Sequence, residues 1–340
     1  MNRRKLVWRS TAMVLLCCVV GCKPPSDNLV VQTVTGSEVV SNNEIWLSHE
    51  HILVDFIGAD SISPDRWDRQ VVVKEMTPYL EQLNTYNVSY FVDATPNYLA
   101  RDVALLEQIA RQTGLKIITN TGLYGARQNK FVPAYAFRKT ADELAEMWIS
   151  EFEEGIDGTS VKPGFIKISV DATDPLDDMH VKLVEAAALT HLRTGLTIAS
   201  HTGKSVGLWP QLEILKQNGV SPKAFIWVHA QNEKDDQEYL RAAKSGCWIS
   251  LDGLGWNIDQ YIGKLLFAKA HGILGNVLIS HDAGWYDPAK EQQSIKPYTN
   301  IFEQLYPALM SRGFQEEEFK LLLGHNPAQA FSLDVRRLGD

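Results

Sequence analysis

Cysteine is scarce in this chain, with four among 340 residues. Three of them, Cys17, Cys18 and Cys22, lie in the first 22 residues, and only Cys247 follows. A single thiol after residue 22 excludes a disulfide framework within the rest of the chain. Cys247 precedes Trp248 in an apolar run, so we interpret it as a small buried side chain rather than a nucleophile.

Positive charge is also in short supply, since 33 Lys and Arg face 41 Asp and Glu, for a net charge of −8. This balance excludes the basic footprint of a nucleic-acid-binding protein, and we expect no nucleic-acid partner. No acidic tail or basic arm interrupts the mixed charges. Hydrophobic residues make up 45% and charged residues 22%, a globular composition that allows a core of full size.

The N-terminal segment is apolar but too short to span a bilayer. Basic residues at 3–5 precede a mostly apolar stretch over 12–20, a pattern typical of a secretory signal. The stretch is followed by Gly21 and Cys22, and the sequence Val-Val-Gly-Cys resembles the end of a bacterial lipoprotein signal. Val19 departs from that pattern, because leucine is usual three residues before the cysteine.

We therefore expect a lipoprotein-type signal peptide over residues 1–22, lipidation of Cys22 and a short tether over 23–28. A lipid anchor would hold the protein at a membrane of the cell envelope, as a periplasmic or outer-membrane lipoprotein. A simple inner-membrane anchor and a signal cleaved without lipidation are the alternatives. Residues 29–340 contain no linker or low-complexity stretch, and we predict that they form one domain.

Short apolar runs alternate with longer amphipathic segments along this domain. We predict eight strands, over 44–47, 89–92, 116–119, 164–168, 196–199, 224–228, 247–251 and 276–279. Helices are predicted between them, for example over 101–112, 141–154, 176–193, 209–218 and 235–244. Eight strands alternating with helices predict an α/β fold, a single-domain (β/α)8 TIM barrel. A doubly wound open sheet is the alternative, but no glycine-rich phosphate turn follows the first strand.

Both ends of the domain carry additional local signals. Apolar residues at 30–34 and 39–40 flank Thr35-Gly36, which predicts a small N-terminal β-hairpin. Near the C-terminus, Asn326 followed by Pro327 is typical of a helix start, with Asn326 as the N-cap.

Six side chains able to bind metals stand at or near the ends of predicted strands. Two imidazoles separated by one residue share a face of strand one and can chelate an ion. A lysine lies inside apolar strand four, where an unpaired ammonium is costly. Taken alone, each residue has an ordinary interpretation as a strand-end polar group or a lysine that reaches solvent. The six residues are His49, His51, Lys167, His201, His229 and Asp282.

The spacing of these residues favours one shared site. They are separated by roughly whole strand–helix units, so they fall at the C-terminal ends of strands one, four, five, six and eight. The catalytic groups of a TIM barrel converge on that rim. Four histidines, a lysine and an aspartate gathered there predict a metal site.

The chain resembles the phosphotriesterase family of the amidohydrolase superfamily over nearly all of residues 29–340. The most specific matching stretches are Leu-Ser-His-Glu-His at 47–51, Gly-Phe-Ile-Lys at 164–167 and Ser-His-Asp at 280–282. Further similar stretches lie at 92–96, 121–124, 201–203 and 326–328. The resemblance implies a hydrolase with two divalent metals, expected to be zinc, although manganese, cobalt or iron would suit the same ligands.

The resemblance also implies a role for each ligand. His49, His51 and Asp282 would hold one metal, and His201 and His229 the other. Lys167, carbamylated to N6-carboxylysine, and a hydroxide would bridge the two metals, because a carbamate offers two anionic oxygens where an ammonium offers none. Asp282 would accept the proton released in the reaction.

Aromatic residues on the predicted rim suggest a partly apolar small-molecule ester as substrate. They are Tyr124, Trp256, Trp285 and Tyr286, and packing of the loops onto the barrel is the alternative role. Carboxyl esters and lactones are the expected substrates, with phosphotriester hydrolysis as a weaker activity. Lactone-hydrolysing relatives usually carry an arginine in the loop after strand seven, and organophosphate hydrolases carry histidines there. Residues 251–260 contain neither, so the sequence leaves the substrate open.

Two other functions remain alternatives. A surface-anchored binding protein could retain the metals without catalysis, although the complete ligand set argues against such decay. A TatD-type nuclease also begins with His-x-His, but it resembles this chain less on strand four, where it carries a glutamate in place of Lys167. A homodimer is compatible with the sequence.

Overall fold

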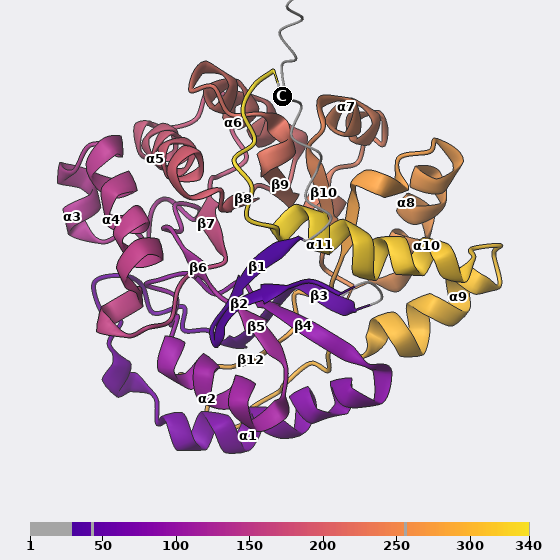
Figure 1. Cartoon of the computed structure of the whole chain (residues 1–340), viewed down its shortest axis with the longest axis horizontal. Coiled ribbons are helices and arrows are strands. Elements are labelled where there is room, and N and C mark those ends of the chain that lie inside the picture. Colours follow the sequence, from indigo (N-terminus) through magenta and orange to yellow (C-terminus); the bar gives the residue numbers. More distant parts are fainter. Residues whose placement is uncertain (1–28, 42–43, 255–256, 340) are drawn as a thin grey trace, which may run out of the picture.

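A computed structural model describes residues 29–41, 44–254 and 257–339. Its parallel strands form a barrel surrounded by helices, which confirms the predicted (β/α)8 fold (Figure 1). In chain order the barrel strands are β3 (Ile45–Leu53), β4 (Val88–Asp93), β5 (Lys116–Ile118) continued by β6 (Asn120–Thr121), β7 (Phe165–Ser169), β8 (Thr197–His201), β9 (Phe225–Val228), β10 (Trp248–Leu251) and β11 (Val277–Ile279).

The third barrel strand is interrupted, and this differs from the single run predicted over 116–119. β5 pairs with β4, whereas β6 pairs with β7, so the chain passes from one neighbour to the other at Thr119. The barrel closes between β11 and β3, where the Asp282 amide donates to the His49 carbonyl at 3.1 Å. A short unpredicted strand, β12 (Gly284–Tyr286), also pairs in parallel with β3.

The helices begin and end at residues whose local chemistry explains the boundaries. Thr140 and Glu143 form a reciprocal capping box at the start of α4 (Ala141–Glu154), and Asp102 caps α2 (Val103–Thr113). Gly114 and Gly195 end α2 and α5 in the left-handed conformation, with φ of 77° and 74°.

The helices of the described residues are α1 (Arg69–Glu81), α2 (Val103–Thr113), α3 (Ala134–Arg138), α4 (Ala141–Glu154), α5 (Asp178–Thr194), α6 (Ser205–Gln217), α7 (Gln237–Ser245), α8 (Ile258–Ala270), α9 (Tyr306–Met310), α10 (Glu316–Lys320) and α11 (Asn326–Phe331). Over these same residues, none of the helices has both the length and the apolar character to cross a membrane. The predicted signal, tether and lipidation site at Cys22 lie outside the described residues.

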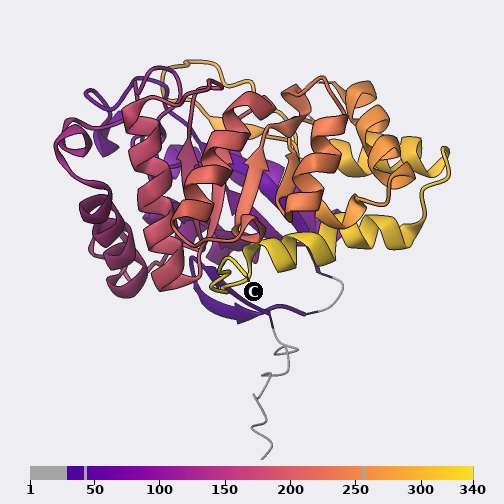
Figure 2. The ribbon, with the colours of Figure 1, turned by 90° about the horizontal axis from the view of Figure 1, so that it is seen from above.

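The end of the barrel where the strands begin is closed by apolar packing. Trp46 and Tyr90 stack inside it with ring centroids 3.8 Å apart, and Phe331 of α11 packs against Trp46 and Phe165. Val31, from the predicted hairpin of β1 (Val30–Thr33) and β2 (Gly36–Val39), joins the same cluster. Figure 2 shows the hairpin and α11 together beneath the barrel. The catalytic groups of a TIM barrel gather at the opposite end, where the strands finish.

The predicted N-cap role of Asn326 is wrong. The chain is already helical before this residue, through α10 and a π-helical turn over Leu321–His325, and Asn326 itself has a helical φ of −60°. Its buried side-chain amide donates to the carbonyls of Leu274 and Val277, at 2.8 and 2.7 Å. Asn326 thus holds α11 against the end of the barrel through these two hydrogen bonds.

Candidate metal centre

The two histidines of the first barrel strand lie within the strand rather than after it. β3 continues through His49 and His51 to Leu53, with an irregular register between Leu47 and Glu50. The Nε2 atoms of His49 and His51 lie 3.6 and 3.1 Å from Oδ1 of Asp282. One ligand atom from each of these three residues lies within 4.8 Å of the others, a spacing that suits a single metal ion.

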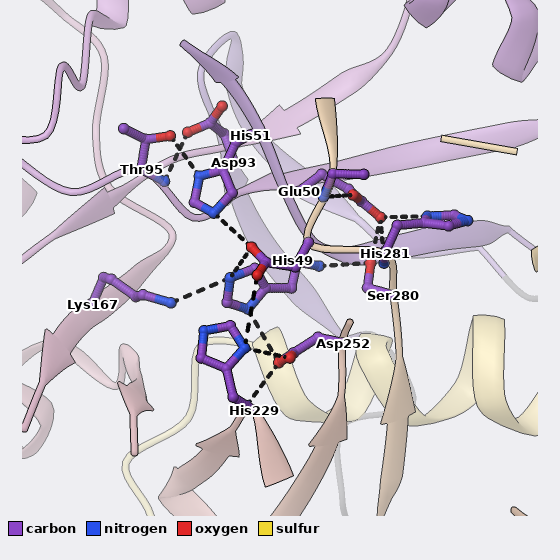
Figure 3. A network of polar contacts seen from close by, with 12 residues as sticks. His49, Glu50, His51, Asp93, Thr95, Lys167, His229, Asp252, Ser280 and His281 are labelled. Atoms are coloured by element: carbon purple, nitrogen blue, oxygen red, sulfur yellow. Dashed lines mark hydrogen bonds and ion pairs between the residues drawn. The ribbon is translucent and has the colours of Figure 1, made fainter. Parts of the chain in front are cut away.

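The other three predicted ligands converge on the same place. Nζ of Lys167, on β7, is 3.5 Å from His49 Nε2 (Figure 3). The ring of His201, the last residue of β8, lies 4.4 Å from that of His229, which in turn lies 5.1 Å from that of His49. Among the described residues, the His201 ring has ring contacts but no hydrogen bond, so its nitrogens are available to a metal. The structure thus brings all six predicted residues together.

Two of these residues have a strained backbone. His229 and Asp282 are in the left-handed region, with φ of 60° and 49°. Such a conformation costs about 1–3 kcal/mol in a residue other than glycine and persists where the surroundings hold it. The His229 amide donates to Asp252 Oδ2 at 3.1 Å, and the Asp282 amide donates to the His49 carbonyl. Both side chains are therefore aimed at the site by their neighbours.

Asp252, at the end of β10, was missed by the sequence reasoning. It is fully buried, and its two oxygens lie 2.6 Å from His229 Nδ1 and 3.3 Å from His49 Nδ1. It also accepts a hydrogen bond from Gln231 Nε2 at 3.1 Å. A carboxylate at Nδ1 fixes the ring and the tautomer, leaving Nε2 free to bind metal. Its position at a strand end, like those of the predicted ligands, was the signal that could have found it.

Glu50 anchors the loop that carries Asp282. It is fully buried and accepts hydrogen bonds from Ser280 Oγ at 2.7 Å, from the His281 amide at 3.0 Å and from the Ala283 amide at 3.1 Å. His281 Nδ1 lies 2.7 Å from the same carboxylate, while its Nε2 accepts from the Ile301 amide (Figure 3). His281 therefore carries its proton on Nδ1 and positions the loop rather than binding metal.

The electrostatics of the cluster place His49 and Asp282 in the forms that bind metal. Burial lowers the pKa of Lys167 to about 8, and burial together with Lys167 lowers the pKa of His49 to about 4. Burial opposes the charge on Asp282, but His229 and His51 still hold the pKa of this carboxyl well below its usual range. At neutral pH, the site therefore combines a neutral His49 with a charged carboxylate, the forms that ligate metals.

The residues present fit a divalent metal ion held by His49, His51 and Asp282. Asp252 occupies Nδ1 of two imidazoles, and Thr95 Oγ1 lies 2.7 Å from Nδ1 of His51. The Nε2 atoms of His49 and His51 therefore face Asp282. Imidazole nitrogens with one carboxylate are a donor set that suits zinc, manganese, cobalt or iron.

A model of the Phosphotriesterase family matches residues 29–331. The chain belongs to this family. The aryldialkylphosphatase of Saccharolobus solfataricus is 27% identical to it over 314 residues, which cover 87% of this chain and 98% of the relative. The N-acetyltaurine hydrolase of Rattus norvegicus is 25% identical over 342 residues, covering 88% and 97%.

The fold is similar to that of a solved phosphotriesterase-family enzyme. A double mutant of the organophosphorus hydrolase from Deinococcus radiodurans superposes with a TM-score of 0.81 at 25% identity, over 89% of this chain and 97% of that one. The relatives are named as hydrolases, and this phosphotriesterase-family chain is a hydrolase by the same relationship.

Gly253, in the loop after the seventh strand, has little room for a side chain. A Cβ at Gly253 would lie 2.5 Å from the Tyr261 hydroxyl and 2.7 Å from Gln231 Nε2. Gln231 is itself fixed, because it donates to Asp252 and accepts from the Asp252 amide. A larger residue at 253 would push against Gln231, which holds Asp252, the carboxylate that orients His49 and His229.

The predicted rim aromatics have different surroundings. Tyr124 lies 5.1 Å from the His201 ring, and Trp285 lies 5.9 Å from the His51 ring. Tyr286, the next residue along β12, packs instead against the main hydrophobic core. Trp256 lies outside the described residues. The substrate roles of all four remain predictions.

Proposed function

We propose that this protein is a metal-dependent hydrolase of carboxyl esters, lactones included, with two divalent ions at the C-terminal end of the barrel. The convergence of six potential ligands at that end, two of them oriented by the buried Asp252, carries the proposal. The family membership supports hydrolysis. The names of the relatives span an aryldialkylphosphatase and an N-acetyltaurine hydrolase, so they support no single bond type.

Each residue has an assigned place in this proposal. His49, His51 and Asp282 hold one ion, His201 and His229 hold the other, and Lys167 bridges them as N6-carboxylysine. When bound, the ions activate a water at neutral pH and polarise the bond under attack. Lys167 supports this assignment because it is almost fully buried, and its Nζ lies 3.5 Å from His49 without a carboxylate ion pair in the described residues.

Asp282 is the proton acceptor in the proposed reaction. Its side chain is 25% exposed, whereas that of His49 is 4% exposed, so Asp282 faces the space open to substrate. Its low pKa keeps it ionised at neutral pH, and the Nε2 of His51 at 3.1 Å steadies one oxygen. Asp282→Asn should lower turnover by orders of magnitude while metal is retained. Wild-type turnover in that variant with both ions bound would show the mechanism to be wrong.

A combined metal and activity measurement tests the function. Purified protein is assayed for divalent ions and for turnover of lactones, aryl esters, phosphotriesters and N-acetyltaurine. We expect esters or lactones to be the best substrates, phosphotriesters to be weaker, and His201→Ala or His229→Ala to remove at least one ion and most activity. Bound metal without turnover of any substrate would identify a binding protein instead.

We also propose that the protein is a lipoprotein of the cell envelope, on the basis of the Val-Val-Gly-Cys sequence that ends at Cys22. Cys22→Ser should leave the protein soluble or unprocessed, and membrane fractionation with mass measurement of the mature chain would show this. An unchanged mature mass and unchanged membrane association would count against lipidation.

A further inference from the structure

A continuous series of aromatic rings connects the two halves of the candidate metal centre. We call Tyr124, Phe131, Phe56 and Trp285 the aromatic arc. It begins at His201, 5.1 Å from Tyr124, and ends at His51, 5.9 Å from Trp285. Between these ends, successive ring centroids are 5.7, 6.3 and 6.5 Å apart, at edge-to-face angles. The arc therefore provides an apolar wall that reaches both groups of ligands.

Hydrogen bonds fix the two loops that carry the middle of the arc. The Ala59 amide donates to the Lys130 carbonyl at 3.1 Å, and Lys130 Nζ donates to the Phe56 carbonyl at 2.7 Å. Phe131 is fully buried, whereas Phe56 is 38% exposed. Phe56 is thus the most exposed member of the arc, and Tyr124 and Trp285 are partly buried.

Arg127 is held over this exposed ring by an unusual turn. Arg127, Gln128 and Asn129 all have left-handed backbones, with φ of 60°, 58° and 59°. The amides of Arg127 and Gln128 donate to the Asp171 carboxylate at 2.8 and 3.0 Å. Three consecutive strained residues, none of them glycine, persist only because neighbours hold them, and such strain clusters at functional sites.

The guanidinium of Arg127 lies 5.1 Å from the Phe56 ring centroid and is not neutralised there. The side chain is exposed, and within the described residues no carboxylate forms an ion pair with its guanidinium. Asp171 accepts from the backbone of the turn, and nearby Asp55 is already paired with Arg66. Arg127 therefore places an uncompensated positive charge at the edge of the arc, near Lys130, whose Nζ lies 5.3 Å from the Phe131 centroid and already donates to the Phe56 carbonyl.

We propose that the aromatic arc and Arg127 form a substrate subsite for an apolar group that ends in an anion, such as a carboxylate or sulfonate. The inference rests on the proposed function, because the arc is taken as the place of the apolar part of the substrate. The apolar part packs against Trp285 and Phe56, and the anion pairs with Arg127 at the rim, away from the metal ligands. The subsite selects substrates by charge at the end remote from the bond that is cleaved.

Equilibrium binding tests this subsite without requiring turnover. The probes are phenylpropanesulfonate, whose sulfonate is a poor metal ligand, and the uncharged phenylpropanol. Wild-type protein should bind the sulfonate about fivefold more tightly, the upper end for an exposed ion pair, and the preference should shrink as salt is raised. Arg127→Gln should abolish the preference and Arg127→Lys should keep part of it. Arg138→Gln, which removes an exposed arginine of α3, should leave it unchanged.

The outcomes separate this inference from the proposed function. Equal binding of the two probes to wild-type protein, or a preference that survives Arg127→Gln, would overturn the subsite. Turnover of phenyl acetate, measured on the same metal-loaded samples, reports on the function alone. An Arg127-dependent preference without turnover of any ester would leave the subsite standing and reject ester hydrolysis.

Discussion

Replacing Asp252 by asparagine tests whether this buried carboxylate prepares the imidazoles of His49 and His229 for metal. Its oxygens lie 3.3 Å from Nδ1 of His49 and 2.6 Å from Nδ1 of His229. An asparagine of the same shape has one oxygen and one NH2, so one ring N–H faces a donor. That ring must lose its hydrogen bond or move its proton to Nε2, the atom needed for the metal. Loss of such an orienting group lowers metal affinity about 10–100-fold, or about 1.4–2.8 kcal/mol.

The assay is a competitive titration of zinc between the protein and a fluorescent chelator. Asp102→Asn is the matched control, because Asp102 is a nearly buried carboxylate that caps α2 and bonds Trp67 and Arg69 instead of a histidine. The control should lose stability and keep wild-type zinc affinity. If Asp252→Asn binds zinc within about twofold of wild type, the carboxylate does not orient the ligands and the reasoning fails.

Three further predictions concern Glu50, Glu233 and Lys167. Glu50→Gln places an amide NH2 against a donor such as the Ala283 amide, and should cost about 2 kcal/mol of unfolding free energy, measured by denaturant titration of metal-free protein. The pKa of Glu233 is held at about 2, because hydrogen bonds from the amides of residues 205, 234 and 235 outweigh the effect of its burial. The ionised Glu233 therefore stabilises the fold above about pH 4.5, and this stabilisation is lost as the pH falls towards 2. Glu233→Gln should therefore lose about 2 kcal/mol of unfolding free energy at pH 7, less than the full pKa shift implies because solvent screens this partly exposed carboxylate. The difference from wild type should narrow only below pH 4.5, and a difference independent of pH would contradict this. Lys167→Ala should bind metal poorly, and added acetate or bicarbonate should restore part of the activity; a crystal structure with unmodified Lys167 turned away from two bound ions would reject the carbamate.

The barrel could be predicted from the sequence because its strands are buried on both faces and therefore consist of short apolar runs. The prediction for α4, residues 141–154, matches the structure because Thr140 and Glu143 form a capping box and Gly155 follows the helix. Asn326 shows the limit of such local signals. Asparagine before proline looks like a helix start, but here the buried amide is used to bond Leu274 and Val277 inside a longer helix.

The metal-binding residues were predictable because they differ chemically from the apolar strands that they follow. Asp252 was not, since one aspartate at a strand end is an ordinary residue until the fold brings His49 and His229 to it. Arg127 was not predictable either, because its position over Phe56 depends on a left-handed turn at residues 127–129, none of which is glycine. Asp252 and Arg127 act through contacts with residues far away in the sequence, and a single sequence does not show which distant residues come together.

The most direct test of the account is the number of divalent ions per chain in purified protein, measured by inductively coupled plasma mass spectrometry. If the six residues hold a pair of metals, the wild-type chain carries about two ions, and His201→Ala and His229→Ala each carry fewer. A wild-type chain that carries no divalent ion after exposure to zinc or manganese, or a count that is unchanged in both variants, would contradict the assignment of these residues as metal ligands.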